Sequence, residues 1–245
     1  MKIPVIEGLI DRRILVNFRV DPTVLAPLLP APFRPQLANG AGMAGVCLIR
    51  LKQIRPRGLP GFLGISSENA AHRIAVEWDE GGTACQGVYI PRRDTSSRLN
   101  TLVGGRLFPG VHHHATFDVR ETAEDFHVAL ASADGSTRVE VDGRVATDLP
   151  SGSIFRSLAE ASRFFERGAL GYSETRVPGT YDGLELRSRD WRVEPLDVTR
   201  LESSFFSDTD RFPKGSAVLD CALLMRHIHH EWHGRTPLCA QPVAG

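Results

Sequence analysis

Lysine is nearly absent from this sequence of 245 residues. Only Lys2, Lys52 and Lys214 are lysines, and arginines supply the rest of the 29 basic side chains. A mechanism that depends on an amine nucleophile therefore has three side chains to choose from. Acidic residues also number 29, so no net charge points to nucleic acid or a membrane surface as the partner. We expect a small-molecule ligand, and neither a nucleic-acid nor a membrane partner.

Paired cysteines and long apolar runs are missing as well. Cys47, Cys85, Cys221 and Cys239 lie far apart and form no CxxC motif. This spacing excludes a zinc ribbon and indicates reduced thiols. No apolar run approaches the roughly 18 residues of a membrane span, and the first residues lack the long apolar stretch of a signal peptide. These absences predict a cytoplasmic protein.

Apolar and polar residues alternate over much of the chain, which is typical of strands. Hydrophobic residues make up 42% of the sequence, enough for a sizeable core. Two strand pieces are expected within residues 63–78, separated by the polar run 66–72, and a charged turn is expected at 91–97. Residues 133–136 have the composition of a hairpin turn. Because no repeat, linker or change in composition divides the sequence, we predict one domain over residues 1–245. Further strands are expected at residues 12–20, 44–51, 83–90, 126–130, 138–145 and 184–198, and residues 217–224 fit either a strand or a buried helix.

Helix signals are few. Asp21 and Pro22 have the residue types of an N-cap and a first-turn proline, and they predict a short helix. Ser157 and Glu160 form a capping box in front of a segment whose apolar residues share one helical face. One or two helical turns are also expected at residues 99–102. The chain is therefore predicted to be mainly β, with a few short helices.

Three consecutive histidines are the most conspicuous chemical feature. His112, His113 and His114 follow a turn rich in glycine and proline at residues 104–110 and precede an alternating segment. We expect them to open a strand, with His112 and His114 on one face and His113 on the other. Imidazole, with an unperturbed pKa of about 6.5, can act as acid, base or metal ligand near neutral pH. A solvated strand end rich in histidine is the alternative.

Two other segments offer charged groups. Glu68 stands beside Ser67 and Asn69 in a segment that apolar residues frame on both sides. A carboxyl group that is partly desolvated in such a place has a raised pKa. A turn or N-cap carboxylate is the alternative interpretation. Arg92, Arg93 and Asp94 form a group suited to clamping an anionic substrate through paired hydrogen bonds. A solvated turn with an internal ion pair explains the same three residues.

Several known site types can be excluded, and one metal alternative stays open. His230-Glu231-Trp232-His233 is one residue short of the HExxH zinc motif, so a zincin is excluded. The sequence also contains neither a GxSxG nucleophile elbow nor a P-loop. A metal site would need His112 and His114 with a third ligand from Glu68 or a C-terminal histidine. Our preferred interpretation contains no metal and no cofactor.

Local patterns in the first half of the chain resemble acetoacetate decarboxylase. Phe18-Arg19-Val20-Asp21, followed by Leu25, Leu28-Leu29-Pro30 and Pro32, resembles that family's opening strand and helix. Residues 63–68, Leu-Gly-Ile-Ser-Ser-Glu, resemble the segment with its active-site glutamate, and residues 105–114 resemble a glycine-arginine segment that ends in a lysine pair. Together with residues 66–73 and 89–95, they make nearly the whole chain similar to the uncharacterised YqjF-like family of the acetoacetate-decarboxylase-like superfamily.

The resemblance implies a fold. Members of this superfamily have a large curved antiparallel sheet that forms a closed or nearly closed barrel, with the active-site cavity inside. The predicted strands agree with such a sheet, although their number alone also fits a sandwich. Because members of the superfamily often assemble, the resemblance also implies a homo-oligomer.

The resemblance implies an altered chemistry. By position, the family's Schiff-base lysine falls on His113 and its neighbouring lysine on His114, while the active-site glutamate falls on Glu68. The family's cavity arginine falls within a residue of Arg12. Imidazole cannot form the iminium that stores the electrons of a departing carboxylate. The resemblance therefore implies no acetoacetate decarboxylation by the family mechanism.

Two classes of function fit these residues. In the first, His113 donates or accepts a proton, Glu68 polarises it, and His114 or His112 stabilises an oxyanion on a small keto or unsaturated carboxylic acid. Arg12 or Arg92 would then anchor the carboxylate of this anionic substrate. In the second, the same cavity binds a small ligand without chemistry. A site with metal ligated by histidine belongs to either class.

Overall fold

The computed structural model describes residues 4–98 and 110–239, and most of them lie in one sheet. The predicted helical turns at 99–102 and the part of the glycine and proline turn at 104–109 lie outside the described residues. The strands are β1 (Ile6–Val20), β2 (Arg34–Pro35), β3 (Leu37–Ala38), β4 (Ala41–Pro56), β5 (Ile65–Glu80), β6 (Thr83–Thr95), β7 (His112–Glu121), β8 (Asp125–Ser132), β9 (Arg138–Val145), β10 (Leu170–Glu174), β11 (Thr180–Ser188), β12 (Glu194–Ser203) and β13 (Ala217–Cys239). The helices are α1 (Pro22–Leu25) and α3 (Leu158–Glu166), with 3-10 turns at Ala26–Leu28, Gly61–Leu63 and Arg167–Ala169.

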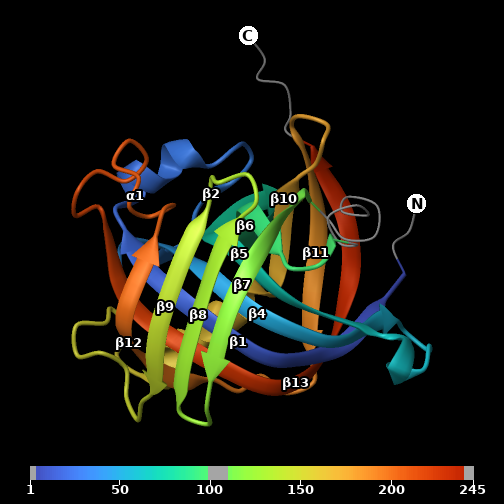
Figure 1. The fold of residues 1–245 in the computed structure, drawn as a ribbon. Coiled ribbons are helices and arrows are strands. Elements are labelled where there is room, and N and C mark those ends of the chain that lie inside the picture. Colours follow the sequence, from blue (N-terminus) through green and yellow to red (C-terminus); the bar gives the residue numbers. More distant parts are fainter. Residues whose placement is uncertain (1–3, 99–109, 240–245) are drawn as a thin grey trace.

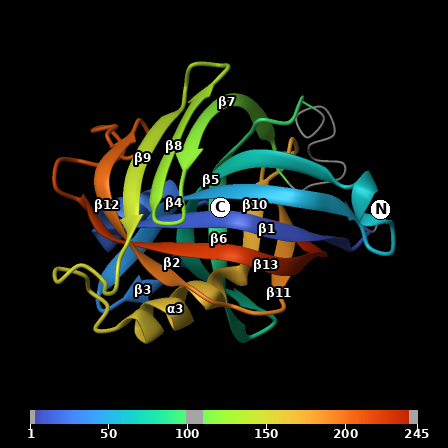
Figure 2. The ribbon, with the colours of Figure 1, turned by 60° about the horizontal axis from the view of Figure 1, so that its bottom comes forward.

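The sheet closes on itself twice. Its strand order is β11-β10-β6-β7-β8-β9-β12-β13-β1-β4-β5-β2, and β5 also pairs with β6 while β11 also pairs with β13. In Figure 1, β7, β8, β9 and β12 form one wall, and the long strands β1, β4 and β13 cross behind it. Figure 2 shows the same long strands side by side, with α3 beneath them. This ring-like, mainly β architecture with few short helices confirms the predicted fold class.

Each face of the long strands carries a hydrophobic core of its own. On β1, Ile14 and Val16 pack into one cluster with Leu224, whereas the intervening Leu15 packs into the other with Leu223. We call these the first and the second interior. Because successive strand residues point to opposite faces, two neighbours in the sequence enter different interiors. The same alternation decides which interior each polar side chain of these strands enters.

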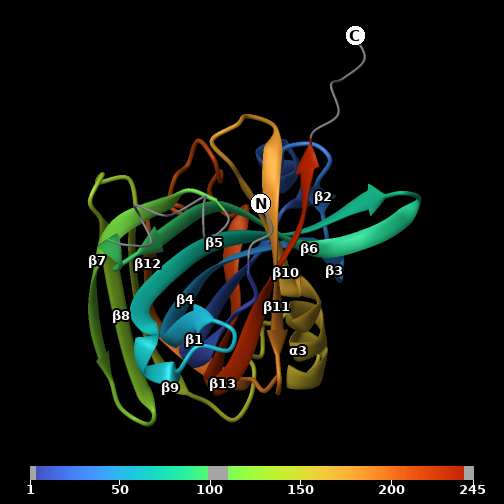
Figure 3. The same cartoon turned by 90° about the vertical axis from the view of Figure 1, so that its right-hand side faces the viewer.

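Both predicted helices are present and capped as expected. The Asp21 carboxylate accepts a hydrogen bond from the Thr23 backbone N–H at 2.8 Å, which begins α1. The Ser157 hydroxyl accepts one from the Glu160 N–H at 3.2 Å, which begins α3. Phe165 of α3 packs in the second interior, and Figure 3 shows this helix beside β11. None of the described helices is long and apolar enough to cross a membrane.

Three strand predictions were wrong in extent. The polar run at 66–72 is part of β5, which is one continuous strand, and the expected turn at 91–97 belongs largely to β6. Pro91 fits into β6 because the β5–β6 register shifts between His72 and Ile74, where no ladder N–H is required. Residues 184–198 divide between β11 and β12, and residues 217–224 open the strand β13.

Candidate functional site

The three histidines begin β7, which runs parallel to the end of β6. His112 pairs with Arg93, His113 with Asp94 and His114 with Thr95. Paired residues on neighbouring strands point to the same face, so His112 and His114 lie on the face of Arg93. His113 lies on the opposite face. The predicted alternation of the histidines is therefore confirmed.

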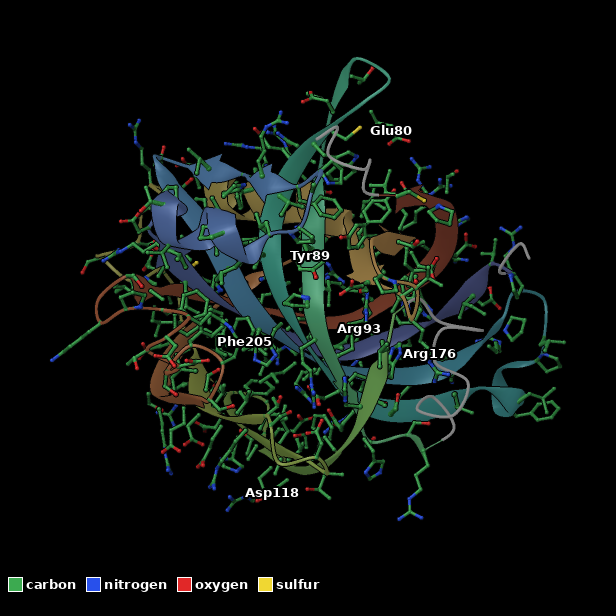
Figure 4. All side chains as sticks on the ribbon, turned by 90° about the horizontal axis from the view of Figure 1, so that it is seen from above. Glu80, Tyr89, Arg93, Asp118, Arg176 and Phe205 are labelled. Atoms are coloured by element: carbon green, nitrogen blue, oxygen red, sulfur yellow. The ribbon has the colours of Figure 1, made fainter. Side chains whose placement is uncertain are left out.

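A small cavity opens in the second interior beside His112. Its volume is about 80 Å³, and its polar lining includes His112, Arg93, Ser67 and Asn69. A neighbouring cavity of about 110 Å³ shares several walls with it, among them Ala71, and Arg93 lines both. In Figure 4, Arg93 lies toward the middle of the molecule, whereas Asp118 lies at its edge. The two cavities together form one candidate site, which we call the arginine cavity.

Arg93 presents a guanidinium group to this cavity without a carboxylate partner among the residues that the structure describes. Its Nε donates a hydrogen bond to the Ser173 hydroxyl at 3.0 Å. Asp94, next to it in the chain, is bonded by Arg92 on the opposite face. Burial lowers the pKa of Arg93 to about 10, which leaves the group charged at neutral pH. A buried cation of this kind is suited to binding an anionic ligand.

His112 is a neutral imidazole beside this cation. Burial lowers its pKa to about 4, and the positive charge of Arg93 acts in the same direction. At neutral pH the ring can donate a hydrogen bond or accept a proton. An anion bound to Arg93 would offset the nearby positive charge and make the imidazole a stronger base.

The side-chain amide of Asn69 forms another part of the cavity wall, and hydrogen bonds hold its orientation. Asn69 donates a hydrogen bond from Nδ2 to the Ser67 carbonyl at 3.1 Å, and its Oδ1 accepts one from the Thr95 hydroxyl at 2.8 Å. These bonds fix which end of the amide faces the cavity. Sequence reasoning assigned no role to Ser67 or Asn69, and it considered Arg93 only as part of the anion clamp with Arg92 and Asp94. The signal that could have found them is the parity of β5 and β6, since all three are neighbours of residues that were singled out.

Glu68 points away from the arginine cavity into the first interior. Its carboxylate accepts hydrogen bonds from Arg12 Nη2 and from Arg50 Nε. Glu121 joins the same network, with its Oε2 at 3.2 Å from Arg12 Nε. The structure thus places the predicted site residues Glu68 and Arg12 in contact with each other. They belong to an ionic network in which arginines and glutamates balance in charge. In the described part of the chain, neither of them contacts His113 or lines the arginine cavity.

Arg92 and His113 gather around a hairpin turn. Arg92 Nη2 bonds Asp94 Oδ1 at 2.8 Å, and its Nη1 bonds Asp134 Oδ2 at 3.0 Å. His113 Nδ1 lies 3.2 Å from the same Asp134 oxygen. Burial raises the pKa of Asp94, and the hydrogen bond from Arg92 opposes this effect. The two carboxylates balance the guanidinium of Arg92, which agrees with the internal ion pair considered as the alternative.

Comparison with protein families decides where this chain belongs. The family model DUF2071, described as "Uncharacterized conserved protein (COG2071)", matches residues 10–220. The chain belongs to this family. This agrees with the resemblance to the YqjF-like family. None of the curated proteins matches the chain.

Solved structures with the same fold as this DUF2071 chain include an acetoacetate-decarboxylase-like enzyme, an acetoacetate decarboxylase and an enzyme of enduracididine biosynthesis. An acetoacetate-decarboxylase-like enzyme from Sphingomonas wittichii RW1 is 14% identical, with a TM-score of 0.59 over 97% of this chain and 94% of that one. Acetoacetate decarboxylase from Legionella pneumophila is 11% identical, with a TM-score of 0.58 over 95% and 86% of the two chains. The enduracididine biosynthesis enzyme MppR, complexed with pyruvate, is 12% identical, with a TM-score of 0.58 over 98% and 91%. At these identities the likeness establishes the fold of the DUF2071 chain.

A different arginine from the one predicted faces the cavity of this DUF2071 protein. The register of β1 against β4 shifts between Ile10 and Arg12, and beyond the shift Arg12 points into the first interior. Arg13 lines the arginine cavity instead. The resemblance placed the superfamily's cavity arginine within a residue of Arg12, and Arg13, the next residue, lines the arginine cavity.

The metal alternative does not assemble around His112 and His114. Their face is opposite to that of Glu68, one of the third ligands considered, and in the described chain no C-terminal histidine groups with them within ligand distance. Among the described residues, the side chains whose ligand atoms come within 4.8 Å of one another are His127, Glu140 and Asp142. Two of these are already engaged, since His127 bonds Asp142 at 2.6 Å. This DUF2071 chain therefore offers no histidine-based metal site at the arginine cavity within its described residues.

Proposed function

We propose that this protein is a small-molecule enzyme of the acetoacetate-decarboxylase-like superfamily that acts on a small keto or unsaturated carboxylic acid. The acid binds in the arginine cavity, with its carboxylate on Arg93. His112 moves a proton at the carbon next to the carbonyl or double bond. The observation that carries this proposal is the buried guanidinium of Arg93, without a carboxylate partner in the described chain, beside a neutral imidazole.

The chemistry follows from the charges of the bound state. The carboxylate partly neutralises Arg93, so the imidazole of His112 becomes basic enough to take a proton from carbon. Negative charge then develops on the carbonyl oxygen of the enolate, and the guanidinium of Arg93 stabilises it. Return of the proton to the other end of the enolate system completes an isomerisation, and return to the same carbon completes a proton exchange.

The two lysines in the described part of the chain lie away from the arginine cavity. Lys52 Nζ pairs with Asp11 at 2.9 Å and is half-exposed, and Lys214 is exposed. Neither lysine lines the cavity. This arrangement supports acid–base chemistry by imidazole over the Schiff-base mechanism of acetoacetate decarboxylation. The choice of a keto acid is supported by MppR, a protein of the same fold whose structure contains pyruvate.

Deuterium exchange tests the proposal. Wild-type protein should speed the exchange of carbon-bound protons of small 2-keto, 3-keto and unsaturated acids in D₂O, followed by ¹H NMR. His112→Gln should lower kcat about 10²- to 10⁴-fold, the usual value of one positioned acid or base. Arg93→Gln should mainly raise KM. His113→Ala is the matched control, because it removes the neighbouring imidazole from the opposite face.

Three results would overturn parts of this assignment. Equal exchange by wild type and His112→Gln would remove His112 as the proton-transfer group. A loss of exchange in His113→Ala, but not in His112→Gln, would restore the histidine first predicted from the sequence. Binding of keto acids, detected by a thermal shift that Arg93→Gln abolishes, without any exchange would make the protein a non-catalytic binding protein.

A further inference from the structure

Two more arginines share the arginine cavity with Arg93. Arg13 on β1 and Arg73 on β5 both line the part of the cavity that Arg93 also borders. In the chain as described, neither has a carboxylate partner within ion-pair distance. By contrast, Arg12 of β1 and Arg50 of the adjacent strand β4 are paired with acidic groups. The cavity therefore has three guanidinium groups without a carboxylate within ion-pair distance among the described residues, and Asp94, a carboxylate in its lining, is bonded to Arg92.

Arg13 donates its described hydrogen bonds only to sulfur. Its Nε is 3.3 Å from Cys47 Sγ, and its Nη1 is 3.9 Å from Met225 Sδ. Thiol and thioether sulfurs are weak acceptors, and a guanidinium group has five N–H donors. Most of the hydrogen-bonding capacity of Arg13 is therefore available to a ligand in the cavity.

Arg73 is buried, with 7% of its surface exposed. Its Nη2 donates to the Asn17 side-chain oxygen, and its guanidinium carbon lies 5.2 Å from the centre of the Phe165 ring. Its Nε has no hydrogen-bond partner among the residues that the structure describes. Burial lowers the pKa of Arg73 to about 10, so it stays charged at neutral pH. A buried cation without a counter-charge is costly unless a ligand supplies one.

The space between these groups suits an elongated ligand. Cys47, Ala71 and Arg93 follow one another across β4, β5 and β6, and Arg13 stands on β1, which pairs with β4. The floor between Arg13 and Arg93 is thus made by the small side chains Cys47 and Ala71. One guanidinium lies at each end of this floor.

We propose that the ligand of the arginine cavity carries two anionic groups and is a small dicarboxylic acid. Arg93 holds the carboxylate next to the reacting carbon, and Arg13 holds the second carboxylate, with Arg73 adding positive charge beneath it. This inference rests on the proposed function, because it names the class of acid that the same cavity binds. It adds a specificity-determining residue, Arg13, to the reactive end formed by Arg93 and His112.

Calorimetry with matched ligands tests the inference. Succinate and succinamate have the same skeleton, but the second has an amide in place of one carboxylate. Wild-type protein should bind succinate about tenfold or more tightly than succinamate, as expected for one charge-assisted pair. Arg13→Gln should remove this preference by weakening succinate binding at least tenfold, whereas Arg93→Gln should weaken binding of both ligands. Arg120→Gln, at an exposed arginine, is the control.

The possible failures are distinguishable. Equal affinity of wild-type protein for succinate and succinamate would overturn the dicarboxylate and leave the proposed function standing. Absence of binding by both ligands and by keto acids would overturn both proposals. If inorganic phosphate displaces succinate at equal concentration, the ligand is a compact dianion and the dicarboxylate class is wrong. Should Arg13→Gln fail to fold, Arg13→Met, which suits a site lined by Cys47 and Met225, provides the second variant.

Discussion

At the scale of single residues, parity along the strands decides which side chains can share a ligand. The alternation of His112, His113 and His114 was predictable, because a strand end has a period of two. The face on which Glu68 lies was not predictable. Until the partner strands are known, either Glu68 or its neighbours Ser67 and Asn69 could face the cavity. The sequence also could not tell which of Arg12 and Arg13 lines the arginine cavity, because the register shift between Ile10 and Arg12 cannot be seen in the sequence.

The pKa of His112 should report ligand binding. Burial and Arg93 hold it at about 4 in the free protein. A bound carboxylate adds negative charge near the ring, so the pKa should rise by about one unit or more. Ring ¹⁵N chemical shifts of His112, followed from about pH 3 to 8 with and without saturating 2-oxobutyrate, measure this change.

Two variants make the origin of that rise explicit. Arg93→Gln removes the positive charge but not the burial, so the free protein should have a higher pKa at His112 that no longer responds to the acid. The exposed His227 provides the internal control within each titration. An unchanged pKa of His112 in the saturated wild-type protein would mean that the acid binds elsewhere.

At the scale of elements, local signals were sufficient for helices and insufficient for the strands of the site. The capping residues of α3 lie within three positions of each other, so the sequence contained the whole signal. The polar run at 66–72 was interpreted as a break. Its side chains are instead divided between the ionic network of the first interior and the arginine cavity of the second, so polar residues here indicate a site inside a strand.

Gly45 of β4 should be essential for the pairing of the long strands. It pairs with Asn17 on one side and Arg73 on the other, and the Arg73–Asn17 hydrogen bond spans this position. A Cβ at Gly45 would come within 2.3 Å of the Val16 carbonyl oxygen. We expect Gly45→Ala to lower the free energy of unfolding by about 1–3 kcal/mol, measured by urea denaturation.

The matched control for this change is Gly152→Ala. No atom lies within 4 Å of a Cβ at Gly152, so its effect should stay within about 0.5 kcal/mol. If the two variants are equally stable, β1 and β4 can separate locally without cost, and the close approach at Gly45 is not structurally important. Loss of succinate binding in Gly45→Ala would further tie the strand spacing to the position of Arg73.

At the scale of the whole molecule, the resemblance predicted more than the residue pattern did. The strand pattern alone fitted a sandwich or a barrel, and only the family resemblance indicated a large curved sheet with an internal cavity. Neither indicated that the long strands β1, β4, β5, β6 and β13 would carry a separate interior on each face. That arrangement depends on pairings between strands more than a hundred residues apart, such as β1 with β13.

Burial of ionisable groups in two interiors gives the molecule a dependence on pH. His72, in the first interior, is fully buried, and its ring centre lies 4.5 Å from that of Phe205. Burial lowers its pKa to about 3, and Arg92 and Arg211 add to the effect. His230, in the second interior, has its pKa lowered to about 4 by burial and then by Arg13. Both rings are neutral in the folded protein and become charged on unfolding in acid.

Stability should therefore fall as the pH drops below the unfolded histidine value of 6.5 toward the folded value of about 3. In that window the unfolded chain binds the proton and the folded chain does not, whereas above it the contribution of His72 is constant. Between about pH 7.5 and 5, His72 alone should cost roughly 2 kcal/mol of unfolding free energy. His72→Phe keeps the ring against Phe205 and should remove that share of the loss in urea titrations, whereas the exposed His227→Ala should not. An acid sensitivity in His72→Phe equal to that of the wild type would show that His72 is protonated inside the fold.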